Sequence, residues 1–299
     1  MRFFVSGVGG QLGYDVAKEL LQRGHTVMGT GLELQSPISG ISYLPLDIRE
    51  SVALLEALRQ YRPDAVIHCA AWTAVDLAEE PANLPQVRAV NVEATECIAA
   101  ACKELGSKLT YLSTDYVFDG SGNAPWQEDS VDFAPCNVYG QSKLDGERVV
   151  RSTLERHFIL RISWVFGSHG SNFVKTMLSL AQKYDALRVV NDQVGAPTYT
   201  VDLARFIVDL NESEAYGTYH ASNEGGDISW YEFACEIFQQ ADVHVQVSPV
   251  STAEYGLSKA RRPYNSRLSK TKLRQNGFLP LPDWRDALER YLKEIRQKG

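Results

Sequence analysis

Short, mostly apolar runs alternate with segments of helical periodicity along the first half of the chain. Runs of strand length occupy residues 2–6, 26–30, 65–71, 108–113 and 158–163. Between them, Leu12, Val16 and Leu20 recur every four residues, and similar apolar stripes run through residues 51–60 and 90–105. This periodicity predicts helices. Because strands that alternate with helices form parallel βαβ units, the pattern predicts an α/β fold built on a doubly wound parallel sheet.

A glycine-rich turn follows the first predicted strand. Gly7, Gly10 and Gly13 are spaced as GxxGxxG, with Gln11 and Leu12 between the last two glycines. Glycines at such a turn let backbone N–H groups approach a pyrophosphate, whose charge the helix N-terminus favours. The turn therefore predicts a bound dinucleotide and a sheet of the Rossmann type. A purely structural glycine turn is the alternative.

The regular alternation of strands and helices ends near residue 165, where glycine, proline and asparagine interrupt the pattern. We expect residues 1–165 to form a dinucleotide-binding Rossmann domain, to which later elements at about 190–222 return. Residues 166–299 are expected to form mainly a smaller, interleaved substrate-binding region.

The end of the second predicted strand bears on which dinucleotide binds. An acid there accepts a hydrogen bond from the ribose 2′-hydroxyl of NAD, but the strand ends at Gly31 and the next acid is Glu33. Without that acid nothing repels a 2′-phosphate, so we expect NADPH, with NADH as the alternative. Asp47, followed by Ile48, is predicted either to bond an adenine amine or to cap the helix at 51–60.

Composition narrows the class of protein. The 299 residues carry a net charge of −7, with 44% apolar and 22% charged residues, values typical of a globular enzyme. A nucleic-acid-binding protein is usually basic, and no apolar run approaches the ~18 residues of a membrane span. The five cysteines form no CxxC pair, which disfavours a metal or redox motif and favours a reduced, cytoplasmic protein.

A Tyr-x-x-x-Lys pair supplies the candidate chemistry. Tyr139 and Lys143 lie one helical turn apart on the same face. A nearby cation stabilises tyrosinate, so we expect the pKa of Tyr139 to be lowered from its usual ~10. Such a tyrosine donates a proton to a carbonyl oxygen.

The position of this pair distinguishes it from chance matches. The same spacing occurs at Tyr14/Lys18 and at Tyr255/Lys259. Only the Tyr139 pair follows a strand that ends in hydroxyls, Ser113 and Thr114. Ligands of open α/β sheets bind at the carboxyl ends of strands, so Thr114 and Tyr139 are predicted to converge there.

Together these features resemble the extended short-chain dehydrogenase/reductases, and finer segments resemble the dTDP-4-dehydrorhamnose reductase family among them. The resemblance runs from residue 7 to about residue 270. The segments that carry it are 10–13, 70–76 (AAWTAVD), 113–120 (STDYVFDG), 161–167 (RISWVFG), 195–198 (GAPT) and 262–266 (RPYNS).

The resemblance implies reduction of the C4 ketone of dTDP-4-dehydro-β-L-rhamnose to dTDP-β-L-rhamnose, with NADPH or NADH as hydride donor. By analogy, Tyr139 is the general acid, Lys143 binds the nicotinamide ribose and Thr114 polarises the ketone. Ala70, Ala71 and Tyr139 would border the nicotinamide. The substrate side would be formed by Thr73, Val75, Thr114, Trp164, Thr198, Arg262 and Asn265. Some members of that family dimerise through a metal held by surface glutamates; a homodimer is therefore a candidate assembly, and no metal ligand is identified here.

Two other functions stay open at this point. A 4-epimerase of the same superfamily would keep its cofactor bound, whereas a 4,6-dehydratase is disfavoured because Tyr116 stands where a second acid would follow Asp115. A non-catalytic, NADP-binding regulatory subunit, like the β subunit of methionine adenosyltransferase, shares the motifs around Tyr116 and Tyr139. The segments at 163–166 and 195–198 favour the reductase.

Overall fold

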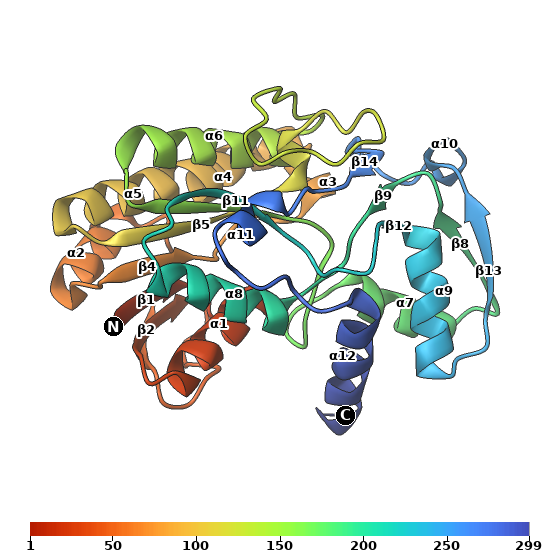
Figure 1. Cartoon of the computed structure of the whole chain (residues 1–299), viewed down its shortest axis with the longest axis horizontal. Helices are drawn as coiled ribbons and strands as arrows, with labels where there is room; N and C mark the ends of the chain where they lie inside the picture. Colours follow the sequence, from red (N-terminus) through yellow and green to blue (C-terminus); the bar gives the residue numbers. More distant parts are fainter. Residues whose placement is uncertain (299) are drawn as a thin grey trace.

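A seven-stranded parallel sheet forms the centre of the molecule (Figure 1). The computed structural model describes residues 1–298. The strand order is β11-β6-β5-β4-β1-β2-β3, and every neighbouring pair is parallel. The strands are β1 (Arg2–Ser6), β2 (Thr26–Gly31), β3 (Ser42–Pro45), β4 (Ala65–His68), β5 (Lys108–Thr114), β6 (His157–Ile162) and β11 (Gly217–Ala221). The predicted doubly wound sheet is confirmed.

Helices cover both faces of the sheet, as Figure 1 shows. On one face α1 (Gln11–Gln22) and α8 (Thr200–Glu212) pack against each other. The other face is covered by α2 (Ser51–Tyr61), α5 (Ala94–Leu105) and α6 (Val138–Thr153). Successive residues of β1 serve the two cores: Phe3 and Val5 are buried against the α1 side and Phe4 against the α5 side. This double burial explains why the strands lack polar alternation.

Two predicted elements have different limits in the structure. The strand expected over 65–71 ends at His68, and residues 69–71 turn away from the sheet. The helix expected over 90–105 begins with a π turn, η2 (Ala89–Glu93), before α5. That turn brings Asn91 against the segment that follows β4, where its side chain bonds both backbone groups of Trp72.

Smaller elements gather beyond the carboxyl end of the sheet, and a third apolar core that includes Phe166, Phe233 and Trp284 holds most of them together. The strands are β7 (Val165–Phe166), β8 (Ala186–Val190), β9 (Val194–Gly195), β10 (Thr198–Tyr199), β12 (Ile228–Ser229), β13 (Gln246–Val250) and β14 (Asn265–Ser266). The helices and turns are α3 (Val75–Ala78), η1 (Pro81–Asn83), α4 (Leu84–Arg88), η3 (Asp115–Val117), α7 (Phe173–Ala181), α9 (Trp230–Ala241), α10 (Thr252–Tyr255), α11 (Thr271–Gln275) and α12 (Trp284–Lys298). Within residues 1–298, no helix has the length and apolar character needed to cross a membrane.

Candidate active site

A cavity of about 1040 Å³ lies at the carboxyl ends of the central strands. Its walls come from the glycine turn after β1, the segments after β4, β5 and β6, and the N-terminal half of α6. Helices α7 and α9 of the smaller region close the remaining side. The cavity therefore occupies the place where open α/β sheets bind their ligands.

The glycine turn has the geometry of a diphosphate cradle. Gly7 has φ +74°, and a Cβ on it would lie 2.9 Å from the backbone of Ala70. A Cβ on Gly13 would collide with the carbonyl oxygen of Gly7, so only glycine lets α1 start this close to the strand end. Gly10 is the N-cap of α1 and offers no side-chain cap, which leaves amide donors at the helix N-terminus for an anion.

Charges of both signs line the cavity beyond the ends of β2 and β3. Asp47 accepts a bidentate ion pair from Arg49, 2.6 Å at the closest approach, which lowers the pKa of Asp47. Asp47 does not cap α2, because Glu50 occupies the N-cap position. Glu33 folds back so that its carboxylate packs against Gly9 and Gly31. Glu33 lies two residues beyond the end of β2 and still reaches the glycine turn, because the lack of side chains at Gly9 and Gly31 makes room for it.

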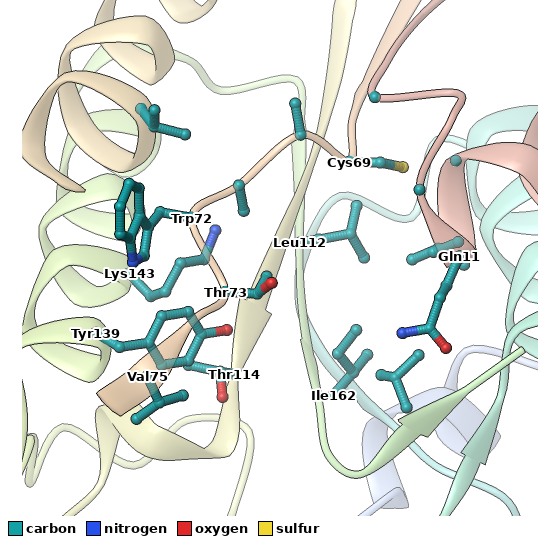
Figure 2. Close-up of a pocket in the computed structure, with 18 of the residues that line it drawn as sticks. Gln11, Cys69, Trp72, Thr73, Val75, Leu112, Thr114, Tyr139, Lys143 and Ile162 are labelled. Atoms are coloured by element: carbon teal, nitrogen blue, oxygen red, sulfur yellow. The ribbon is translucent and has the colours of Figure 1, made fainter. Parts of the chain in front are cut away.

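Helix α6 presents Tyr139 and Lys143 to the cavity. Asn137 caps the helix by accepting a hydrogen bond from the Gly140 N–H at 2.7 Å. A Cβ on Gly140 would collide with the carbonyl oxygen of Tyr116, so glycine lets this helix approach the end of β5. Figure 2 shows the Tyr139, Lys143 and Thr114 side chains on one side of the cavity and Gln11 across from them.

Burial controls the protonation of these groups. It raises the pKa of the Tyr139 phenol, and the neighbouring Asp115 carboxylate adds to the rise. Burial also lowers the pKa of Lys143 to about 7. The ammonium group lies 4.1 Å from the ring centre of Tyr111. The expectation that Lys143 lowers the pKa of Tyr139 is therefore wrong for this structure. Burial and Asp115 raise the pKa, a hydrogen bond with Thr114 opposes the rise only in part, and Tyr139 carries its proton at neutral pH.

Asp115 also lines the cavity, although the sequence did not indicate it as a site residue. Its side chain is 2% exposed and accepts a hydrogen bond from the Thr114 hydroxyl at 3.0 Å. Burial raises the pKa of this carboxyl to about 7, although hydrogen bonds from Ser266 and Thr114 oppose the rise. Its position directly after Thr114, a hydroxyl at a strand end, is the sequence feature that could have identified Asp115 as a cavity residue.

Asn91 ties the segment after β4 to α6. Its Oδ1 accepts from the Trp72 N–H at 2.8 Å, and its Nδ2 donates to the Trp72 carbonyl and to the Ser142 hydroxyl. Ala70 and Ala71, which immediately precede this clamp, line the cavity beside the glycine turn. The clamp therefore fixes the distance between that segment and the helix of Tyr139.

The structure brings together most of the residues that the sequence nominated. The cavity is lined by Gly7, Gly10, Gln11, Leu12, Gly13, Asp47, Ile48, Ala70, Ala71, Thr73, Val75, Thr114, Tyr139, Lys143, Trp164 and Arg262. Thr198 and Asn265 lie behind the wall instead. Thr198 donates to the Ser163 carbonyl at 2.6 Å, and Asn265 donates to the carbonyls of Ser121 and Ala124. Direct contact with a ligand would require these internal bonds to break.

An aromatic wall closes the cavity on the side of the smaller region. It consists of Trp164, Phe173, Trp230 and Phe233. Only Trp164 was nominated from the sequence. The other three come from α7 and α9, which pack against each other in the third apolar core, a contact that no local motif reveals.

Known proteins resemble this chain over almost its full length. Residues 1–297 match the family described as the RmlD substrate binding domain. The dTDP-4-dehydrorhamnose reductase of Shigella flexneri is 37% identical, with 99% of this chain and 98% of that protein aligned. The spore coat polysaccharide biosynthesis protein SpsK of Bacillus subtilis is 38% identical, with 98% and 97% aligned.

Solved structures agree with the sequence relatives. The dTDP-4-dehydrorhamnose reductase of Bacillus anthracis in complex with NADP has a TM-score of 0.89 at 39% identity, covering 98% of this chain and 99% of that one. The Clostridium acetobutylicum protein of the same name has a TM-score of 0.91 at 35% identity, covering 99% and 100%. The strand-end hydroxyl, the Tyr-x-x-x-Lys pair and these relatives lead to one conclusion: the chain belongs to the dTDP-4-dehydrorhamnose reductase family.

Proposed function

We propose that the protein reduces the C4 ketone of dTDP-4-dehydro-β-L-rhamnose to dTDP-β-L-rhamnose, with NADPH as hydride donor. The observation that carries this proposal is the placement of Thr114, Tyr139 and Lys143 in one cavity with the glycine turn. Membership of a family whose curated members bear the name dTDP-4-dehydrorhamnose reductase supports the substrate. The complex of the Bacillus anthracis relative with NADP supports the cofactor.

The chain's own residues fit a reduced nicotinamide dinucleotide. Amides at Gly10 and the first turn of α1 would hold the diphosphate, and Asp47 with Ile48 would border the adenine. Ala70, Ala71 and Lys143 would border the nicotinamide ribose and ring. When bound, the dihydronicotinamide supplies the hydride that adds to C4 of the sugar.

Tyr139 would be the proton donor. Its Oη keeps its proton at neutral pH because burial raises the pKa of the phenol, and this proton passes to the ketone oxygen as the C4–H bond forms. The Thr114 hydroxyl, which donates to the Asp115 side chain in this structure, would turn to donate a hydrogen bond to the same oxygen and so favour the developing negative charge. Lys143, one turn along α6 and in the same cavity, would bind the nicotinamide ribose and so hold the cofactor beside Tyr139.

The substrate side would take the sugar and its diphosphate. Thr73, Val75 and Trp164 would surround the sugar, while Arg262 would face the diphosphate from its ion pair with Asp76, 2.7 Å long. Thr198 and Asn265 would support this side indirectly, since their hydrogen bonds shape the loops around Trp164 and residues 121–124. Because the whole chain carries a net negative charge, a local cation such as Arg262 is needed to bind the negatively charged diphosphate.

A coupled assay on the full chain tests the proposal. The 4-keto sugar nucleotide is supplied with NADPH or NADH in separate reactions, and both cofactor oxidation and the product's C4 configuration are followed. We expect stoichiometric oxidation and dTDP-β-L-rhamnose. A C4 epimer without net oxidation would establish an epimerase, whereas no turnover together with stable co-purification of a larger catalytic protein would establish a regulatory subunit.

A cytoplasmic location belongs to the same proposal. All five cysteines are free, as expected for a protein of a reducing compartment. The proposed homodimer is tested by sedimentation equilibrium of the purified chain, where a single species of twice the chain mass supports it and a monomer contradicts it.

A further inference from the structure

Trp164 has a backbone conformation that is unusual for a bulky residue. It joins β6 to β7 with φ +48°, in the left-handed region that favours glycine. Its neighbours are tied down: the Trp164 carbonyl accepts from the Thr198 N–H at 3.1 Å, and the Ser163 hydroxyl donates to the Ala196 carbonyl at 2.9 Å. Strained residues persist where the surroundings over-determine them, and they cluster at functional sites.

The indole of Trp164 is held from the side as well. It stacks on the indole of Trp230 with ring centres 3.6 Å apart and planes 11° from parallel. A Cβ on Gly195 would lie only 3.1 Å from Cε2 and Nε1 of Trp164, so the absence of a side chain at Gly195 leaves space for the Trp164 indole. Phe173 contacts Trp230 at 4.5 Å between ring centres. Both tryptophans are half-buried and line the cavity.

Trp230 is anchored independently of Trp164. It is the first residue of α9, whose start is fixed by a capping box between Ser229 and Glu232. The Ser229 hydroxyl also donates to Asn191 at 2.7 Å. Further along the helix, Phe233 and Ile237 are buried in the third apolar core. The helix therefore carries Trp230 as a rigid support, and Trp164 is the more strained partner.

We propose that Trp230 is a positioning residue for the sugar end of the cavity: it holds the Trp164 indole in place as the wall against which the sugar ring lies. The inference rests on the proposed function and concerns the same site. A preformed wall spares the substrate the cost of ordering a free indole. The apolar C–H groups on one face of a pyranose pack well against an aromatic ring. Loss of the Trp230 indole should therefore weaken binding of the nucleotide sugar and leave the cofactor site intact.

A double-mutant cycle tests whether Trp230 acts through Trp164. We expect Trp230→Leu and Trp164→Leu each to raise KM for the 4-keto sugar nucleotide, by about three- to tenfold for Trp230 from the usual worth of an aromatic pair. kcat and the Kd of NADPH should change little. The KM of the double variant should equal that of Trp164→Leu alone, because Trp230 has no effect on the sugar once the indole that it holds is gone. Trp230→Phe, which keeps an aromatic support, should restore most of the affinity.

Circular dichroism supplies a readout that does not require turnover. Two stacked indoles couple their transitions, so the wild-type protein should show an exciton couplet in the far ultraviolet that either leucine variant abolishes. Trp126→Phe is the matched control: Trp126 stacks on Phe118 at 4.5 Å and lies outside the cavity wall, so both couplet and KM should persist.

The outcomes separate this inference from the function on which it rests. Additive effects in the double variant, or an unchanged KM once the couplet is lost, would overturn the role of Trp230 and leave the reductase intact. A wild-type protein that shows the couplet but does not reduce the ketone would overturn the proposed function, and the positioning role with it.

Discussion

The Asp115 carboxyl should make the stability of the protein depend on pH in a predictable direction. The side chain is 2% exposed, and burial raises its pKa from the ordinary 3.8 to about 7. An acid whose pKa is raised on folding contributes stability below its unfolded pKa and loses it as the pH rises through the folded value. Asp115→Asn removes this dependence, so the variant should gain on the wild type as the pH rises from about 4 to about 7.

The size of the effect follows from the two pKa values. The interval between 3.8 and about 7, at about 1.36 kcal/mol for each pH unit, corresponds to about 4 kcal/mol. Between pH 5 and pH 8 about two pH units of that interval are crossed, or about 3 kcal/mol. Any constant cost of burying the new amide cancels, because it is the same at both pH values.

Urea denaturation at a series of pH values, followed by tryptophan fluorescence, measures the free energy of unfolding of both proteins. Asp129→Asn serves as a control, since Asp129 is exposed in the loop after β5. We expect the difference between Asp115→Asn and wild type to grow with pH and the control difference to stay flat. A difference between Asp115→Asn and wild type that is equal at pH 5 and pH 8 would refute the desolvation argument.

Three further predictions concern Tyr139, Glu33 and the buried ion pair of Glu147. Tyr139→Phe should lower kcat for ketone reduction by about 10²–10⁴ with little change in the Kd of NADPH; near-normal turnover would remove Tyr139 as proton donor. Glu33→Gln should shift the ratio of cofactor affinities toward NADPH by about fivefold, because it removes the repulsion of ~1 kcal/mol between the Glu33 carboxylate and a 2′-phosphate ~4 Å away at an exposed site. Calorimetric titration with NADPH and NADH measures the ratio, and an unchanged ratio would mean that Glu33 does not face the ribose. Glu147→Gln breaks the 2.8 Å ion pair with the fully buried Arg161 and should cost about 3–5 kcal/mol in urea denaturation, whereas Glu104→Gln, at an exposed pair, should change little; equal effects would argue against burial as the cause.

The sequence by itself determined the fold class and the candidate catalytic pair, because both depend on short-range patterns. Apolar runs buried on both faces mark parallel strands wherever they pair, and the glycine turn and Tyr139/Lys143 need only a strand end or one helical turn for their geometry. Their convergence at the carboxyl edge followed from the rule for open α/β sheets.

Tertiary structure alone decided the electrostatics and the aromatic wall. Desolvation depends on everything packed around a group, so the raised pKa values of Tyr139 and Asp115 are not encoded in the spacing to Lys143. Glu33 reaches the glycine turn because two glycines from different elements leave space for it. Trp230 meets Trp164 across sixty-six residues of chain, a contact that exists only because the third apolar core holds α9 beside the segment that follows β6.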